Sequence, residues 1–161
     1  MVAAFWSACS HYQLGTGAEG KLSFRTIYVA PVENKSHAPQ IRELVTTQLR
    51  EAFARDPRIT LADSPTSADA ILTVALTDYR RDIASAREDD TGLARKFNVT
   101  LTATATLRDN RSGKIFFDRR PVSAVREIFT DSGQIQSEYQ VLPLLADALA
   151  AKLTHAALDV W

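Results

Sequence analysis

Cys9 is the only cysteine of this 161-residue chain, and the residues around it indicate a covalent modification. The eight residues before it are apolar or small, and they end on Ser7 and Ala8. Bacterial lipoprotein signals end in this way, because the signal peptidase requires small side chains before the cut and the free thiol then accepts a diacylglyceryl group. We therefore predict that Cys9 carries a lipid. The alternative is an ordinary free thiol in the N-terminal segment.

The segments around Cys9 predict how the chain is divided. Secretion signals normally start with basic residues and run for about 15–30 residues. Only eight residues precede Cys9, and none of them is Lys or Arg. We interpret residues 1–8 as the remnant of a longer signal. Residues 9–20 are rich in glycine and are predicted to be a lipidated flexible tether, and residues 21–161 a single α/β domain.

Charge is distributed unevenly, although the formal net charge is zero. Residues 108–126 contain six basic and two acidic side chains, whereas residues 127–161 contain five acidic side chains and one lysine. The simpler interpretation is two solvated faces, and the alternative is a basic side that meets an anionic ligand or surface. Strong nucleic-acid binders usually carry a clear basic excess, so we expect no nucleic-acid partner.

Groups that could catalyse a reaction are scattered along the sequence. His11, His37 and His155 are far apart, no glycine-rich loop leads from a strand into a helix, and no serine has the context of a nucleophile elbow. The acidic triplet at 88–90 could hold a cation, but a solvated loop is the simpler interpretation. We therefore predict a protein that is not an enzyme, uses no metal or cofactor, and works by binding.

Hydrophobic periodicity predicts the order β-α-β-β-β-β-α. Residues 96–108 alternate strictly between apolar and polar positions, which is typical of a strand with one buried face. Ser36 is the predicted N-cap of the first helix. The expected strands are 21–32, 58–62, 70–81, 96–108 and 114–129, the expected helices are 38–55 and 134–161, and 82–95 is an expected hairpin tip.

The apolar faces of these strands and helices match one another. We therefore expect an α+β two-layer sandwich, in which two helices pack on one face of a mixed, mostly antiparallel four- to five-stranded sheet. The other sheet face, rich in threonine, is left open. Because the sequence has no apolar run near 18 residues, we expect no transmembrane helix.

Several segments, taken in order, resemble one known family. They are Cys9 with the HYQLG that follows at 11–15, IYVAPVENKS at 27–36, parts of 49–72, YRR at 79–81, the run TLTATATLRDNRSGK at 100–114, and a C-terminal helix ending in Trp161. This combination is similar to the LPS-assembly lipoprotein LptE family, in the compact form found outside the enteric bacteria. The resemblance covers nearly the whole chain from Cys9.

The resemblance implies a function that composition cannot show. It implies an outer-membrane lipoprotein, anchored on the periplasmic side through acylated Cys9, that plugs a large LptD-like β-barrel, helps it fold and helps deliver lipopolysaccharide to the outer surface. Family members bind lipopolysaccharide partly through basic side chains, which would fall on Arg87, Arg95 and Lys96. Such side chains pair with lipid A phosphates through charge-assisted hydrogen bonds.

Two other hypotheses compete with this interpretation. The first is another periplasmic lipoprotein of similar α/β structure that regulates an envelope enzyme such as a peptidoglycan synthase. The second is a small hydrolase, which the scattered chemistry of the sequence disfavours.

Overall fold

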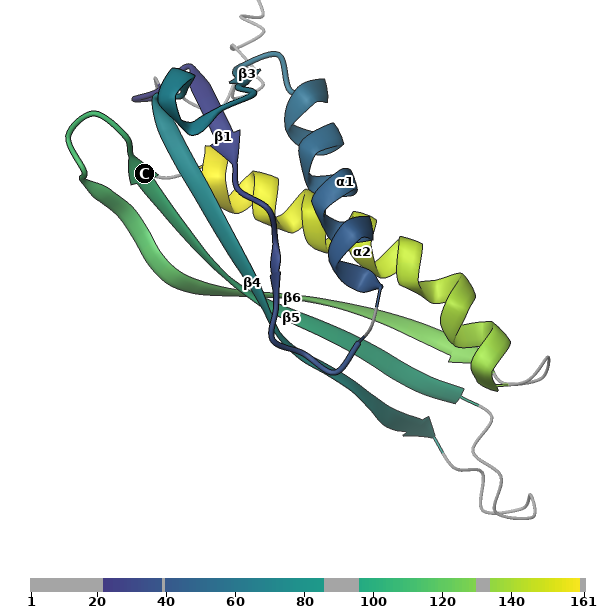
Figure 1. Cartoon of the computed structure of the whole chain (residues 1–161). Coiled ribbons are helices and arrows are strands. Elements are labelled where there is room, and N and C mark those ends of the chain that lie inside the picture. Colours follow the sequence, from purple (N-terminus) through teal and green to yellow (C-terminus); the bar gives the residue numbers. More distant parts are fainter. Residues whose placement is uncertain (1–21, 39, 86–95, 130–133, 160–161) are drawn as a thin grey trace, which may run out of the picture.

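The computed structural model describes residues 22–38, 40–85, 96–129 and 134–159. Two helices lie on one face of a single twisted sheet, and the other face is uncovered (Figure 1). The sheet is mixed: its short N-terminal strands pair in parallel and its three long strands pair antiparallel. The predicted α+β two-layer sandwich is therefore confirmed.

The sheet has the strand order β3-β1-β4-β5-β6, and a two-residue strand, β2, also pairs with β4. The predicted first strand is shorter than expected, because Pro31 separates β1 from β2 and proline cannot donate to a ladder. The strands are β1 (Thr26–Val29), β2 (Glu33–Asn34), β3 (Thr60–Leu61), β4 (Ala70–Ser85), β5 (Lys96–Asp109) and β6 (Ile115–Phe129).

Strand β5 is the centre of the antiparallel part and shows the predicted alternation. Its apolar side chains from Val99 to Leu107 point to the helices and are fully buried at every second position. The threonines between them line the open face, where Thr102 and Thr104 lie opposite Ser123 and Pro121 of β6. One face of the sheet is thus an apolar core surface and the other is polar.

The predicted start of the first helix is wrong. Helix α1 spans Ile41–Arg55, not 38–55, and its N-cap is Gln40, which has a φ of 67° and makes no capping side-chain bond. The Ser36 hydroxyl donates to Asn34 Oδ1 at 2.7 Å, and the Asn34 amide donates to the carbonyl of Ala38 at 2.8 Å. These bonds hold the preceding residues in a turn, so Ser36 closes that turn and does not cap the helix.

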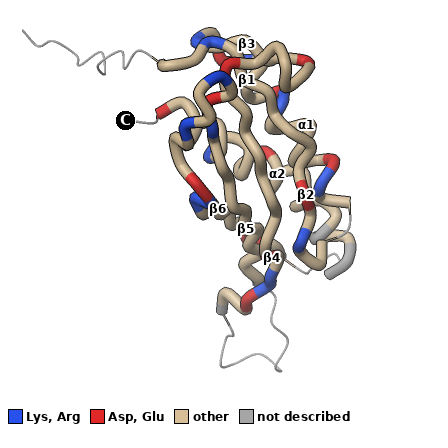
Figure 2. The backbone as a smooth tube through the Cα atoms, turned by 60° about the vertical axis from the view of Figure 1, so that its left-hand side comes forward, with Lys and Arg blue, Asp and Glu red and all other residues tan. Residues whose placement is uncertain are grey.

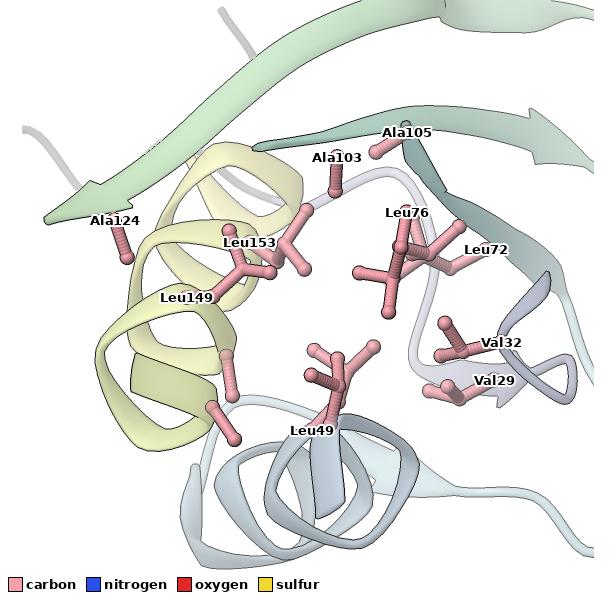
Figure 3. Packing of buried hydrophobic residues seen from close by; sticks show 14 of the residues in the cluster. Val29, Val32, Leu49, Leu72, Leu76, Ala103, Ala105, Ala124, Leu149 and Leu153 are labelled. Atoms are coloured by element: carbon pink, nitrogen blue, oxygen red, sulfur yellow. The ribbon is translucent and has the colours of Figure 1, made fainter. Parts of the chain in front are cut away.

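Helix α2 spans Gln134–Leu158 and supplies much of the core. Figure 3 shows its Leu149 and Leu153 facing Leu49 of α1 and the sheet residues Leu72 and Leu76, all with no exposed surface. Each such side chain contributes roughly 1.5–3 kcal/mol by burial. The segment Tyr139–Leu158 is long and apolar enough to cross a membrane, which the expectation from apolar runs missed. Its buried stripe accounts for that apolar character within the core.

The end of the sheet with the β5–β6 hairpin is held by Asp69. Its Oδ2 accepts hydrogen bonds from the backbone amides of Arg25 and Thr26 at 3.1 and 3.0 Å, and its Oδ1 pairs with Arg111 at 2.7 Å. The amide of Asn110 in the hairpin donates to the Asp69 carbonyl at 2.7 Å. Hydrogen bonds from Arg25 and Thr26 hold the pKa of the Asp69 carboxyl below its ordinary 3.8. One side chain thus joins three segments that are distant in sequence.

Candidate functional site

The candidate site lies at the end of the sheet opposite the hairpin. We call this region the tip and define it by Ile83, Lys96, Glu127, Phe129 and Tyr139. It is formed where β4 ends, β5 begins, β6 ends and α2 begins (Figure 1, lower right). The register confirms the convergence of the strands, because Lys96 lies opposite Phe129 and Ile83 lies opposite Phe97.

Of the predicted site residues, the structure places only Lys96. Arg87, Arg95 and Cys9 lie outside the described residues, so their roles stay predictions. The expected hairpin at 82–95 is corrected in part, because β4 continues to Ser85. Pairing of Arg81 with Val99 and of Ile83 with Phe97 extends the ladder through a charged stretch.

Lys96 is held by an acidic and an aromatic side chain of β6. Its Nζ lies 2.8 Å from Glu127 Oε2 and 5.7 Å from the centre of the Phe129 ring. The Lys96 side chain is 33% exposed and that of Glu127 is 52% exposed, so water screens the pair and it contributes about 0–1 kcal/mol. A more highly charged anion such as a phosphate could therefore replace Glu127 as the partner of Lys96 at little cost in stability.

Large apolar side chains are exposed on both sides of this end of the sheet: Phe129 lies beside Lys96 on the open face, whereas Ile83 and Tyr139 are on the helix side. Ile83 and Tyr139 are each 62% exposed and Phe129 is 57% exposed. Ser137 Oγ donates to the carbonyl of Phe129 at 2.6 Å, which fixes the start of α2 beside the end of β6. Single exposed apolar residues are ordinary, but several at one end of a domain are typical of a binding surface.

A second ion pair lies on the open face close to the tip. Arg80 Nε lies 3.1 Å from Asp82 Oδ2, and both side chains are more than half exposed. Arg80 is opposite Thr100 and Asp82 is opposite Asn98, so both share the uncovered face with Lys96. The open face at the tip therefore offers cations in weak ion pairs and an exposed aromatic ring beside one of them, a combination that suits an amphipathic anion.

The apolar members of the tip were missed by the sequence reasoning. A signal existed for Phe129: it follows Ile128, which points to the helices, so an alternating strand places Phe129 on the open face. Tyr139 had a weaker signal, since it stands before the main leucine stripe of its helix. Within the described residues, no group of three or more His, Cys, Asp or Glu side chains could hold a metal ion.

The sequence model of the LptE lipopolysaccharide-assembly family matches residues 24–156. The chain belongs to the LptE family. The match spans every element of the sheet and nearly all of α2, and it confirms the resemblance seen in the sequence. LptE proteins are non-enzymatic lipoproteins of the cell envelope. No curated protein is significantly similar in sequence.

Solved structures share the fold at low sequence identity. A protein from Xanthomonas campestris is 13% identical, with a TM-score of 0.64 over 89% of each chain. A minor lipoprotein of Acinetobacter baumannii is 18% identical, with a TM-score of 0.56 over 85% of this chain and 94% of that one. Uncharacterized lipoprotein B of Nitrosomonas europaea is 14% identical, with a TM-score of 0.53 over 84% of this chain and 80% of that one. At these identities the likeness describes the fold alone.

Proposed function

We propose that this LptE-family chain is an outer-membrane lipoprotein that occupies the lumen of an LptD-like β-barrel, assists assembly of that barrel and helps deliver lipopolysaccharide to the outer leaflet. The observation that carries the proposal is the family match over residues 24–156. Acylated Cys9 is the proposed anchor on the periplasmic face of the membrane. The fold supports the proposal through two surfaces, the tip and the open sheet face.

The tip is the proposed contact with lipopolysaccharide. Lys96 is a partly exposed cation in a weak ion pair with Glu127, Phe129 beside it is an exposed apolar group, and Ile83 is exposed at the same end of the sheet. Lipid A combines phosphates with acyl chains, so it needs charge-assisted hydrogen bonds beside apolar contact. Arg87 and Arg95, which adjoin this region in sequence, are proposed to add cations to the same site.

The open sheet face is the proposed contact with the barrel lumen. It carries the threonines of β5 together with Ser123 of β6, and Thr106 Oγ1 donates to Asp118 at 2.9 Å. The interior of an outer-membrane barrel is polar and wet, and a hydroxyl-rich face can exchange water for lumen side chains with little loss of hydrogen bonding.

Purification from membranes tests the partnership. The native lipoprotein, extracted in mild detergent and captured through a C-terminal tag, is expected to bring down a large β-barrel protein, and mass spectrometry is expected to find diacylglyceryl on Cys9. Capture of a peptidoglycan synthase with no barrel would contradict the proposal and favour the regulator hypothesis.

Charge reversal at the tip tests the lipid contact. Lys96→Glu is expected to weaken lipopolysaccharide binding roughly tenfold or more in a fluorescent displacement assay, because a hydrogen bond to a charged group contributes about 1.5–3 kcal/mol. Lys35→Glu is the matched control, since Lys35 also pairs with a glutamate, Glu33, at 3.2 Å and is exposed. Equal binding by the two variants would exclude the tip.

A further inference from the structure

The β5–β6 hairpin carries a second basic surface at the end of the domain opposite the tip. We call it the hairpin patch and define it by Arg108, Arg111, Lys114, Ile115 and Arg119. All five are exposed, and Ile115, at 55%, is the apolar member. Figure 2 shows basic segments along this hairpin, with acidic ones among them. The proposed lipopolysaccharide contact does not use this surface.

The two acidic residues of the hairpin are committed to local bonds. Asp109 Oδ1 accepts hydrogen bonds from the amides of Arg111 and Ser112 at 2.9 and 2.7 Å, which close the turn. Asp118 accepts from Thr106 Oγ1 at 2.9 Å and pairs with its neighbour Arg119 at 3.2 Å.

Two cations of the patch form no ion pair of this kind. Arg108 lies directly opposite Ile115 in the ladder, and Lys114 precedes Ile115 in the chain. Neither Arg108 nor Lys114 forms an ion pair within the described parts of the chain. Two unpaired cations therefore flank one exposed apolar side chain.

The patch lies where the chain enters the domain from Cys9. The rings of Phe24 and Phe116 lie 5.7 Å apart, and Asp69 binds both the amide of Arg25 and, through its carbonyl, the amide of Asn110. The first described residues are thus fixed beside the hairpin. Leu22 is 13 residues beyond Cys9, and 13 residues span at most about 45 Å even when fully extended.

We propose that the hairpin patch binds the phosphate headgroups of the bilayer leaflet that holds the Cys9 lipid. The inference rests on the proposed function only in taking Cys9 as the anchor. Arg108 and Lys114 pair with lipid phosphates, as basic clusters next to a membrane anchor do, and Ile115 enters the interface between headgroups and acyl chains.

This contact orients the whole domain. The 14 residues of β5 run from the tip to the hairpin, which at about 3.3 Å per residue is a distance of roughly 45 Å. When the hairpin contacts the headgroups, Lys96 and Phe129 therefore lie at the far end of the domain. The acyl anchor limits the distance of the domain from the membrane. The hairpin patch determines which end of the domain contacts the lipid.

Vesicle co-sedimentation of the full chain, with Cys9 unacylated, tests the patch. The chain is expected to bind vesicles that contain phosphatidylglycerol and not pure phosphatidylcholine vesicles, and binding is expected to fall as salt rises. The double variant Arg108→Glu with Lys114→Glu is expected to lose at least about tenfold in binding, because each basic residue near an anionic surface contributes about fivefold.

The matched control reverses two cations elsewhere. Arg50→Glu with Arg55→Glu makes the same change in net charge on α1, where neither arginine forms an ion pair with the hairpin in the described part of the chain. Binding of this control is expected to stay within about twofold of the unmodified chain. Circular dichroism melting of both variants establishes that they fold. Equal losses in the two variants, or equal binding to both kinds of vesicle, would overturn the inference.

Three further measurements distinguish a contact with lipid headgroups from binding of free phosphate and from a contact with a protein. If inorganic phosphate displaces the chain from vesicles far better than chloride of equal ionic strength, the patch is a site for the free ion and the inference fails. If the hairpin variant keeps vesicle binding but loses capture of a barrel, the patch is a protein contact and the inference fails. Failure of the unmodified chain to capture a barrel, with vesicle binding intact and sensitive to the hairpin variant, would remove the proposed function and leave the patch.

Discussion

The two ends of the long sheet are built differently. At the hairpin end, Asp69 and Asn110 make hydrogen bonds to segments more than 40 residues away in sequence. At the tip, Lys96 pairs with Glu127 of the neighbouring strand and Arg80 pairs with Asp82 of its own strand, and Ile83 and Phe129 are exposed. Bonds between distant segments lower the free energy of the fold, whereas loosely paired cations beside exposed apolar groups are available to a ligand. The comparison suggests that one end carries stability and the other carries binding.

The largest expected effect comes from the core that both ends share. Leu149→Ala is expected to lower the free energy of unfolding by about 2–5 kcal/mol, since Leu149 is fully buried between the helices and the sheet. Leu144→Ala, on the same helix but 57% exposed, is expected to change it by less than about 0.5 kcal/mol. Urea denaturation measures both. A cost at Leu144 equal to that at Leu149 would mean that the start of α2 is packed and not free for a ligand.

The next effect compares one carboxylate at each end. Asp69→Asn is expected to cost about 1–3 kcal/mol, because hydrogen bonds to a charged acceptor are stronger than those to an amide oxygen. Asp82→Asn removes an exposed pair with Arg80 and is expected to cost about 0–1 kcal/mol. The same urea titration decides the order. If the two substitutions cost the same, the two ends do not differ in stability as proposed.

How far the fold could be predicted differs along the chain. Strand β5 was predicted to within one residue, because a strict alternation over its whole length has only one structural solution. Strand β4 was predicted to end at Arg81 and ends at Ser85, because pairing with β5 carries it through residues with no alternation of their own. The sequence pattern determines the length of a strand where one face of that strand packs in the core. Elsewhere, pairing with a neighbouring strand determines it.

The candidate site was predictable only in part, for a related reason. Lys96 was predicted from a family pattern of basic residues, a residue type that indicates an anionic ligand, and its role stays a prediction. The apolar residues of the tip give no such signal, because an apolar residue in a strand or helix is first assigned to the core. They are Ile83, Phe129 and Tyr139. Only the register of three strands shows that Ile83 and Phe129 lie at the same end of the sheet. The hairpin patch was anticipated only as a basic side, without its position beside the chain entry.

Acid is expected to destabilise the fold through Asp69 at the hairpin end. The pKa of Asp69 is lowered from 3.8 in the folded state, so its contribution to stability is present above that value and is lost as the pH falls through the lower folded pKa. The unmodified chain is therefore expected to lose more stability between about pH 5 and pH 2 than Asp69→Asn does. Urea midpoints at a series of pH values measure the difference. Parallel curves for the two chains would show that Asp69 does not link folding to pH.

The last prediction concerns Phe129, where a small loss of stability is expected together with a loss of ligand binding. The ring is 57% exposed and lies 5.7 Å from Lys96 Nζ, and an exposed cation–π contact contributes about 0.5–1 kcal/mol. Phe129→Ala is therefore expected to cost at most about 1 kcal/mol while weakening lipopolysaccharide binding in the displacement assay. Phe117→Ala is the contrasting change on the same strand, since Phe117 is buried, and it is expected to cost about 3–5 kcal/mol. A large stability loss at Phe129 with unchanged binding would assign the tip to the core, because a side chain that stabilises the domain and does not affect the ligand belongs to the fold and not to the site.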